Sequence, residues 1–254
     1  YKRIIEKNNK PSEGMENWSK HVKSFGLGNY LGYDLPEGDK GLIPDGKYYD
    51  TAYKFRWNAS TNISNAIGQG EIITTPIQLA NVTAAIANKG YFYTPHIVKK
   101  IGQNPIQDSI YTIPKQTTID KRHFNPVIEG MREVFKSGTA SWVNIKGIDI
   151  SGKTGTVENF IRVNGKKVAL EDHSILVAFA PKDNPKIALA VFIENGGYGS
   201  TIAAPITSLL IEKYLKGEIS KNRKWIEDRM LEKDLYHIYN QEIQNPKTLA
   251  TGTN

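Results

Sequence analysis

The sequence predicts an α+β fold in which helices flank an antiparallel sheet. Helical periodicity and loops occupy roughly the first 140 residues, and strand patterns follow residue 147. Asn164-Gly165 separates two alternating runs, 159–163 and 166–170, which is a strong hairpin signal. Two short apolar runs, 174–181 and 186–195, are joined by turn residues. Because the hairpin-linked strands come after the helices, these observations favour an α+β arrangement with an antiparallel sheet.

Three helices are expected before the strands. In 15–28, the residues Met15, Trp18, Val22 and Phe25 share one helical face, and Gly26 or Gly28 ends the helix. A long loop over 32–50 is rich in Gly, Pro and Asp. The second helix is capped by Thr75, begins at Pro76 and ends at Gly90. The third is capped by Asn125 and stopped by Gly138, with an inward face of Val127, Met131, Val134 and Phe135.

The strands follow in order. Residues 148–157 are β-branched and alternating, and the hairpin around Asn164-Gly165 comes next. The runs 174–181 and 186–195 are apolar at nearly every position, so both are expected in the middle of a sheet. Residues 200–217 return to a helical pattern. The basic stretch 216–225 alternates with acids further on in 226–234, which is typical of an exposed C-terminal helix, and the tail 241–254 is expected to be disordered.

The composition of the chain excludes several kinds of site and indicates which partners its charge favours. The 254 residues carry a net charge of +7 and no cysteine, which excludes disulfides and thiolate metal sites. A basic surface favours anionic partners, but the Lys and Arg residues are scattered, as on a solvated surface. No apolar run approaches the ~20 residues of a membrane helix. The chain opens at Tyr1 without a signal peptide, so we expect it to be a piece of a longer protein.

One stretch admits two chemical interpretations. Gly147 to Thr154 matches the P-loop pattern G-x-x-x-x-G-K-T, while Lys153-Thr154-Gly155 is the K-T-G element of penicillin-binding proteins and β-lactamases. A P-loop requires a helix that begins at the lysine. Instead, two of the spacer residues are isoleucines that prefer a strand, and the residues after Thr154 are poor helix starters. The pattern therefore favours a strand, and the P-loop remains a remote alternative.

In a strand, Thr154 and Thr156 share one face, and Lys153 and Gly155 share the other. A lysine and two hydroxyls at a strand edge suit recognition of a carboxylate, and the glycine lets a ligand approach closely. The Thr156 amide could point at a developing oxyanion. The competing interpretation is a surface strand with an incidental lysine.

Four separated blocks decide between these interpretations. Residues 25–44, 64–98, 150–159 and 172–206 closely resemble, in order and spacing, class B penicillin-binding proteins of the penicillin-binding protein 2 type. One departure is the stretch DLPEG, where the family more often has a glycine directly after the proline. The resemblance implies a penicillin-binding/β-lactamase-like transpeptidase fold, with residues 1–240 as its C-terminal portion. It implies that the nucleophile helix and two strands of the sheet lie upstream.

The resemblance also implies a function. The parent is expected to be a serine D,D-transpeptidase that cross-links peptidoglycan on the periplasmic, extracytoplasmic face of the bacterial cytoplasmic membrane, with its membrane anchor upstream. Lys153, Thr154 and Thr156 would bind the substrate carboxylate, Gly155 would leave room, and Lys153 and Thr156 would act in catalysis. The expected partners are peptidoglycan stem peptides, β-lactam antibiotics and the cell-wall elongation machinery. Nucleic acid, cofactors and metals are not expected.

The family's other two catalytic elements are not found in the sequence. No S-x-x-K occurs, and the nearest miss is Ser220-Lys221-Asn222-Arg223. The S-x-N at Ser60-Thr61-Asn62 precedes GQGE, where the family does not keep that element, and is interpreted as a chance match. The chain alone is therefore expected to be inactive. His173 could approach the groove or serve as a strand-end hydrogen-bond partner. A β-lactam sensor or a non-catalytic scaffold module on the same fold remains the alternative.

Overall fold

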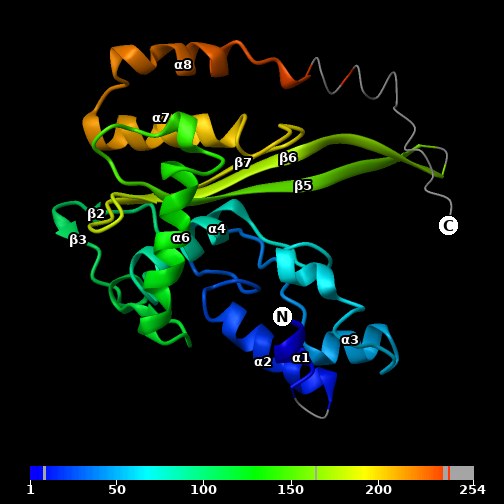
Figure 1. Cartoon of the computed structure of the whole chain (residues 1–254). Helices are drawn as coiled ribbons and strands as arrows, with labels where there is room; N and C mark the ends of the chain where they lie inside the picture. Colours follow the sequence, from blue (N-terminus) through cyan, green and yellow to red (C-terminus); the bar gives the residue numbers. More distant parts are fainter. Residues whose placement is uncertain (8–9, 164, 237–239, 241–254) are drawn as a thin grey trace. The chain divides into compact units, whose positions relative to one another are not determined.

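The computed structural model describes residues 1–7, 10–163, 165–236 and 240. The chain divides into two compact units, Tyr1–Asn125 and Pro126–Asn254 (Figure 1). The expectation that 1–240 form one portion of a transpeptidase domain stays a prediction. The expected disordered tail, 241–254, lies outside the described residues.

The first unit consists of short helices and two small antiparallel strand pairs. Its helices are α1 (Lys2–Ile5), α2 (Pro11–Lys23), α3 (Gly46–Ala52), the 3₁₀ turn η1 (Ile63–Ile67), α4 (Pro76–Ala87), α5 (Ser109–Thr112) and the 3₁₀ turn η2 (Lys121–His123). The strand β1 (Tyr91–Phe92) pairs with β4 (Lys115–Gln116), and β2 (Lys100–Ile101) pairs with β3 (Asn104–Pro105).

Local capping explains where these helices begin. Thr75 and Gln78 form a reciprocal capping box at the start of α4, as the sequence predicts for the Thr75 cap. The helix α2 begins at Pro11, earlier than expected, because a proline is pre-organised for the first helical turn. The predicted loop 32–50 contains the start of α3, which the Asp45 side chain caps by accepting the Tyr48 amide. That part of the loop prediction is wrong.

The helix α6 (Phe124–Lys136) corrects two expectations. Asn125 does not cap it, because the turn η2, capped by Asp120, runs directly into the helix at Phe124. Val127 is 50% exposed, although the sequence predicts that it points inward. The buried face is instead formed by Phe124, Ile128, Met131 and Phe135, at helical spacing.

The second unit holds a three-stranded antiparallel sheet in the order β5-β6-β7. The strands are β5 (Ser151–Val163), β6 (Lys166–Ala180) and β7 (Ile187–Ile193). The predicted hairpin is confirmed by the pairing of Val163 with Lys166 and by Gly165 at φ +79°; Asn164 lies outside the described residues. The expected separate strands merge into two long ones, which extend as a ribbon beyond β7 (Figure 1).

Within the described residues β6 is central, whereas β7 pairs with β6 alone. The expectation that both apolar runs lie in mid-sheet is thus confirmed for β6 only. The helix α7 (Ala203–Lys216) covers one face of β6 and β7 and ends at Gly217, whose φ is +83°. The hydrophobic core of this unit contains Phe135 of α6 together with Leu176, Ala178, Ala180, Val191, Ala203, Ala204 and Ile211.

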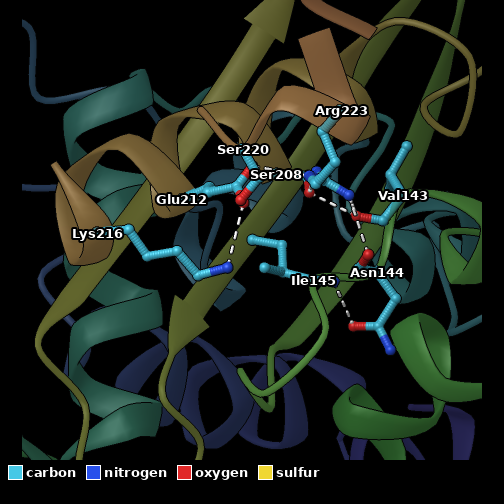
Figure 2. A network of polar contacts seen from close by, with 8 residues as sticks. All are labelled: Val143, Asn144, Ile145, Ser208, Glu212, Lys216, Ser220 and Arg223. Carbon is cyan, nitrogen blue, oxygen red and sulfur yellow. Dashed lines mark hydrogen bonds and ion pairs between the residues drawn. The ribbon is translucent and has the colours of Figure 1, made fainter. Parts of the chain in front are cut away.

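The charged C-terminal segment contains a buried ion pair. The 3₁₀ turn η4 (Lys221–Arg223) leads into α8 (Lys224–Leu231), which packs against α7. Arg223 is buried and pairs with the fully buried carboxylate of Glu212 at 2.7 Å. Its other guanidinium nitrogens donate to Ser208 Oγ and to the carbonyls of Val143 and Asn144 (Figure 2). The predicted exposed C-terminal helix is therefore confirmed in part: α8 is present and most residues of 216–225 are exposed, but the helix begins only at Lys224 and Arg223 is buried.

Burial by itself raises the pKa of the Glu212 carboxyl, because it removes the charged form from water. The hydrogen bonds from Ser220, Arg223 and Lys216 outweigh that effect and lower the pKa below its usual value. Glu212 is consequently an ionised group that ties α7 to η4. In the part of the chain that the structure describes, no helix has the length and apolar character needed to span a membrane.

Candidate active site

The K-T-G residues lie within β5, which runs without a register shift from Ser151 to Val157. One edge of β5 pairs with β6, and the other edge has no strand partner among the described residues. Because β5 continues through Lys153 and Thr154, no helix begins at the lysine. The structure therefore excludes the P-loop alternative, which needs helix N-terminal amides at that position.

Thr154 and Thr156 share one face of β5, as expected from strand alternation. Thr154 is half-buried, and its Oγ1 lies 3.2 Å from the Oγ1 of Thr139, which follows α6. Thr156 is exposed, and its Oγ1 accepts a hydrogen bond from the Gly199 amide at 3.3 Å. Both hydroxyls are thus held by partners from other segments of the second unit.

Lys153 and Gly155 lie on the opposite face, beside Val177 and Ile175 of β6. The Lys153 side chain is exposed, and its Nζ donates to the carbonyl of Thr154 at 2.7 Å. Since this contact is with a neutral carbonyl, the exposed ammonium keeps its positive charge without a carboxylate partner in this contact. A Cβ on Gly155 would lie 3.3 Å from Ile175 Cβ, which is tighter than an ordinary contact.

The loop between β7 and α7 contributes residues that the sequence analysis does not single out. Gly199 lies so close to β5 that a Cβ on it would sit 2.5 Å from the carbonyl oxygens of Gly155 and Ile175. Ser174 of β6 joins the same loop, since its Oγ donates to Tyr198 O and accepts the Ala203 amide, each at 3.1 Å. The available signal is the stretch Gly196-Gly197-Tyr198-Gly199, whose glycines indicate close backbone approach.

The other candidate residues have structural contacts. Ser220 donates to the buried Glu212 carboxylate at 2.6 Å. In the chance S-x-N match, the Asn62 side chain is buried, with its amide nitrogen 3.8 Å from Met15 Sδ. His173 Nδ1 accepts the Asn195 backbone amide at 3.2 Å, so the expected hydrogen-bond role is confirmed, but the residue lies inside β6 and not at a strand end. Among the described residues, no three His, Asp or Glu side chains are grouped as metal ligands would be.

A family model described as the penicillin binding protein transpeptidase domain matches residues 6–212. The chain belongs to this family. The match covers both units and includes the K-T-G strand, so the expected transpeptidase fold is confirmed.

Two relatives of similar sequence indicate the type of penicillin-binding protein to which the chain is related. The peptidoglycan D,D-transpeptidase MrdA of Acinetobacter baumannii is 34% identical over 205 residues, which are 75% of this chain and 30% of that protein. MrdA of Haemophilus influenzae is 30% identical over 235 residues, covering 87% of this chain and 36% of that protein. The chain thus spans about a third of the length of these relatives.

Two solved structures of penicillin-binding protein 2 are similar to this chain. The crystal structure of Pseudomonas aeruginosa PBP2 in complex with WCK 5153 is similar, with a TM-score of 0.67 and 31% identity, over 83% of this chain and 44% of that one. Helicobacter pylori PBP2 in complex with MreC gives a TM-score of 0.63 at 27% identity, over 80% of this chain and 36% of that one. The chain is a partial transpeptidase domain of the penicillin-binding protein 2 type.

Proposed function

We propose that this chain forms the C-terminal part of the transpeptidase domain of a serine D,D-transpeptidase that cross-links peptidoglycan. The observation that carries the proposal is the K-T-G sequence on an open strand edge, in a chain that belongs to the transpeptidase family. The nucleophilic serine in S-x-x-K and the S-x-N element lie upstream of Tyr1 in the parent protein.

The residues of β5 bind the terminal carboxylate of a stem peptide. The Lys153 ammonium supplies a charge-assisted hydrogen bond, and the hydroxyls of Thr154 and Thr156 are neutral donors. Gly155 leaves room for the peptide backbone beside the strand. The Thr156 amide stabilises the oxyanion that develops on the attacked carbonyl.

The reaction proceeds through an acyl-enzyme. The upstream serine oxygen attacks the carbonyl of the penultimate D-alanine, forms an ester and releases the terminal D-alanine. An amine of a neighbouring stem peptide then attacks the ester, forms the cross-link and restores the serine. A β-lactam enters the same first step, in which its ring amide opens, and remains bound as a stable ester.

We place the parent on the extracytoplasmic face of the cytoplasmic membrane, as part of the cell-wall elongation machinery. The structural neighbour solved with MreC supports the proposed assembly, since it is a complex of a penicillin-binding protein 2 with a second protein. No cofactor or metal takes part in the proposed chemistry.

The test uses the parent protein and the isolated chain with labelled penicillin and a D-Ala-D-Ala thioester analogue. The parent is expected to form a stoichiometric covalent adduct and to turn over the thioester, and alanine at the S-x-x-K serine should abolish both. The isolated chain should form no adduct by mass spectrometry, because it lacks the serine. Acylation of the parent without turnover would instead identify a β-lactam sensor, and a covalent adduct on the isolated chain would contradict the proposal.

A further inference from the structure

The loop of residues 194–202, between β7 and α7, is tied to the β5–β6 pair at several successive positions. We infer that His173 is a positioning residue for Thr156, acting through this loop; the inference rests on the function proposed above. It assigns to the histidine a specific task, which is to hold the corner at Asn195 from which the loop reaches the K-T-G strand.

The corner at Asn195 has a backbone conformation that requires support. Its φ is +52°, in the left-handed region that a non-glycine residue adopts at some cost. Two side chains hold it: the Asn195 amide donates to His173 Nδ1 at 3.2 Å, and Asn195 Oδ1 accepts from Asn159 Nδ2 at 2.5 Å. These contacts link the end of β7 to both β6 and β5.

The hydrogen bond at His173 fixes the form of the ring. A backbone N–H can only donate, so Nδ1 must be unprotonated, and the proton of the neutral ring is on Nε2. The ring is also placed by Phe192 of β7, with ring centroids 5.4 Å apart. The acceptor atom is therefore aimed at the Asn195 amide by packing as well as by the strand.

The next residues of the loop connect the corner at Asn195 to Thr156. The Gly197 amide donates to Asp172 O at 2.8 Å, and Tyr198 O accepts from Ser174 Oγ at 3.1 Å. Gly199 follows directly, and its amide donates to Thr156 Oγ1 at 3.3 Å. Only four peptide links separate Asn195 from Gly199. A shift of the backbone at Asn195 would therefore move the Gly199 amide relative to Thr156 Oγ1.

The contact with Gly199 determines where the Thr156 hydroxyl can donate its hydrogen. A hydroxyl has one hydrogen to donate and can accept in other directions. While Oγ1 accepts the Gly199 amide, its own hydrogen is left to donate outward, as a substrate carboxylate requires. Without the amide, the side chain is free to take other rotamers and to use its hydrogen elsewhere. The effect should thus appear in the acylation step more than in folding.

The experiment compares His173→Asn, His173→Gln and His173→Leu in the parent protein. From the backbone outward, Asn Oδ1 stands about where His Nδ1 does, whereas the Gln carbonyl reaches further, to the place of Nε2. We expect His173→Asn to acylate with labelled penicillin like the wild type. His173→Gln and His173→Leu should lose about three- to tenfold in the acylation rate constant, as expected for one ordinary hydrogen bond, with little change in the initial dissociation constant.

A second readout does not depend on activity. Amide hydrogen exchange over 195–199 should accelerate in His173→Gln and His173→Leu and stay at the wild-type rate in His173→Asn. The inference is overturned if Gln and Leu match the wild type in both measurements, or if Asn behaves like Leu. A wild-type parent that is not acylated at all would refute the proposed function, and the exchange rates would still decide the link from His173 to Gly199.

Discussion

Gly199 and Thr156 are joined by a hydrogen bond of 3.3 Å, from the Gly199 amide to Thr156 Oγ1, across 43 residues of sequence. The contact depends on the absence of a side chain, because a Cβ on Gly199 would lie 2.5 Å from two backbone oxygens. Gly199→Ala should therefore push the loop away from β5. We expect slower acylation of the parent by labelled penicillin and a lower free energy of unfolding.

The matched control is Gly130→Ala, in the middle of α6, where an added Cβ meets nothing within 4 Å. This change should leave acylation unaltered and stabilise the protein by roughly 0.5–1 kcal/mol, since alanine favours a helix over glycine. Chemical denaturation and the acylation rate give both values. Equal behaviour of the two variants would show that the close approach of Gly199 does not matter.

Lys153→Ala tests the proposed carboxylate site. The side chain is exposed and donates to the carbonyl of the adjacent Thr154, so little packing is lost. Removal of a charge-assisted contact that matters in the transition state should cost roughly 2–4 kcal/mol, or about 10²–10³ in the acylation rate. The melting temperature should change little.

Lys167→Ala serves as the control on the same hairpin. Lys167 Nζ lies 4.1 Å from the Phe160 ring centroid, and the residue takes no part in the proposed chemistry. Its loss should remove at most about 0.5–1 kcal/mol of cation–π stabilisation and leave acylation at the wild-type rate. An acylation rate of Lys153→Ala equal to that of Lys167→Ala would refute the role given to Lys153.

The elements that local sequence determines were the ones that could be predicted. The Thr75–Gln78 capping box and the hairpin at Asn164-Gly165 each involve neighbouring residues, so their patterns are visible in a short window. The K-T-G strand was predictable because β-branched residues precede it. The Asn125 cap failed because the turn before it, capped by Asp120, already supplied the start of α6.

The remaining features depend on partners far along the chain. Arg223 donates to the carbonyl of Val143, 80 residues away, and nothing near Arg223 indicates burial. Asn195 takes its conformation from His173 and Asn159 on other strands. The edge position of β7 was predictable only from the family resemblance, which implies that its second neighbouring strand lies upstream, since apolar residues on both faces indicate burial but not the number of strand partners.

Arg223→Met should strongly destabilise the second unit. The substitution leaves the buried Glu212 carboxylate with only Ser220 and Lys216 as partners and removes the donors to Val143 and Asn144 (Figure 2). Breaking a buried pair on one side costs about 3–5 kcal/mol. The double variant Glu212→Leu with Arg223→Met should recover part of this loss. Denaturant titrations measure both, and a double variant less stable than Arg223→Met would contradict the explanation.

The lowered pKa of Glu212 predicts that the free energy of unfolding falls at acid pH. The Glu212 pKa is lowered in the folded protein, so its contribution is fully present above the ordinary value of 4.5 and is lost as pH falls through the folded value. The difference in unfolding free energy between wild type and Glu212→Gln should therefore shrink as pH falls below 4.5. A difference that stays constant down to the acid transition would show that the ionised form is not what stabilises the fold.

The far edge of β7 should make the isolated chain prone to association. All seven residues of β7 pair with β6, and the far edge has no strand partner among the described residues. An uncovered apolar edge is a template for pairing with another chain, and a buried backbone group left unpaired costs about 1–3 kcal/mol. We expect the isolated chain to aggregate, to swap or dimerise through 186–194, or to need the upstream part of the parent for solubility.

Two matched variants test this expectation. Ala190→Lys, which places a charge on β7, should reduce association, whereas Ala169→Lys on the hairpin arm of β6 should not. Sedimentation velocity and hydrogen exchange measure this, and a monodisperse wild-type monomer with 186–194 as protected as β6 would show that the chain closes its own sheet.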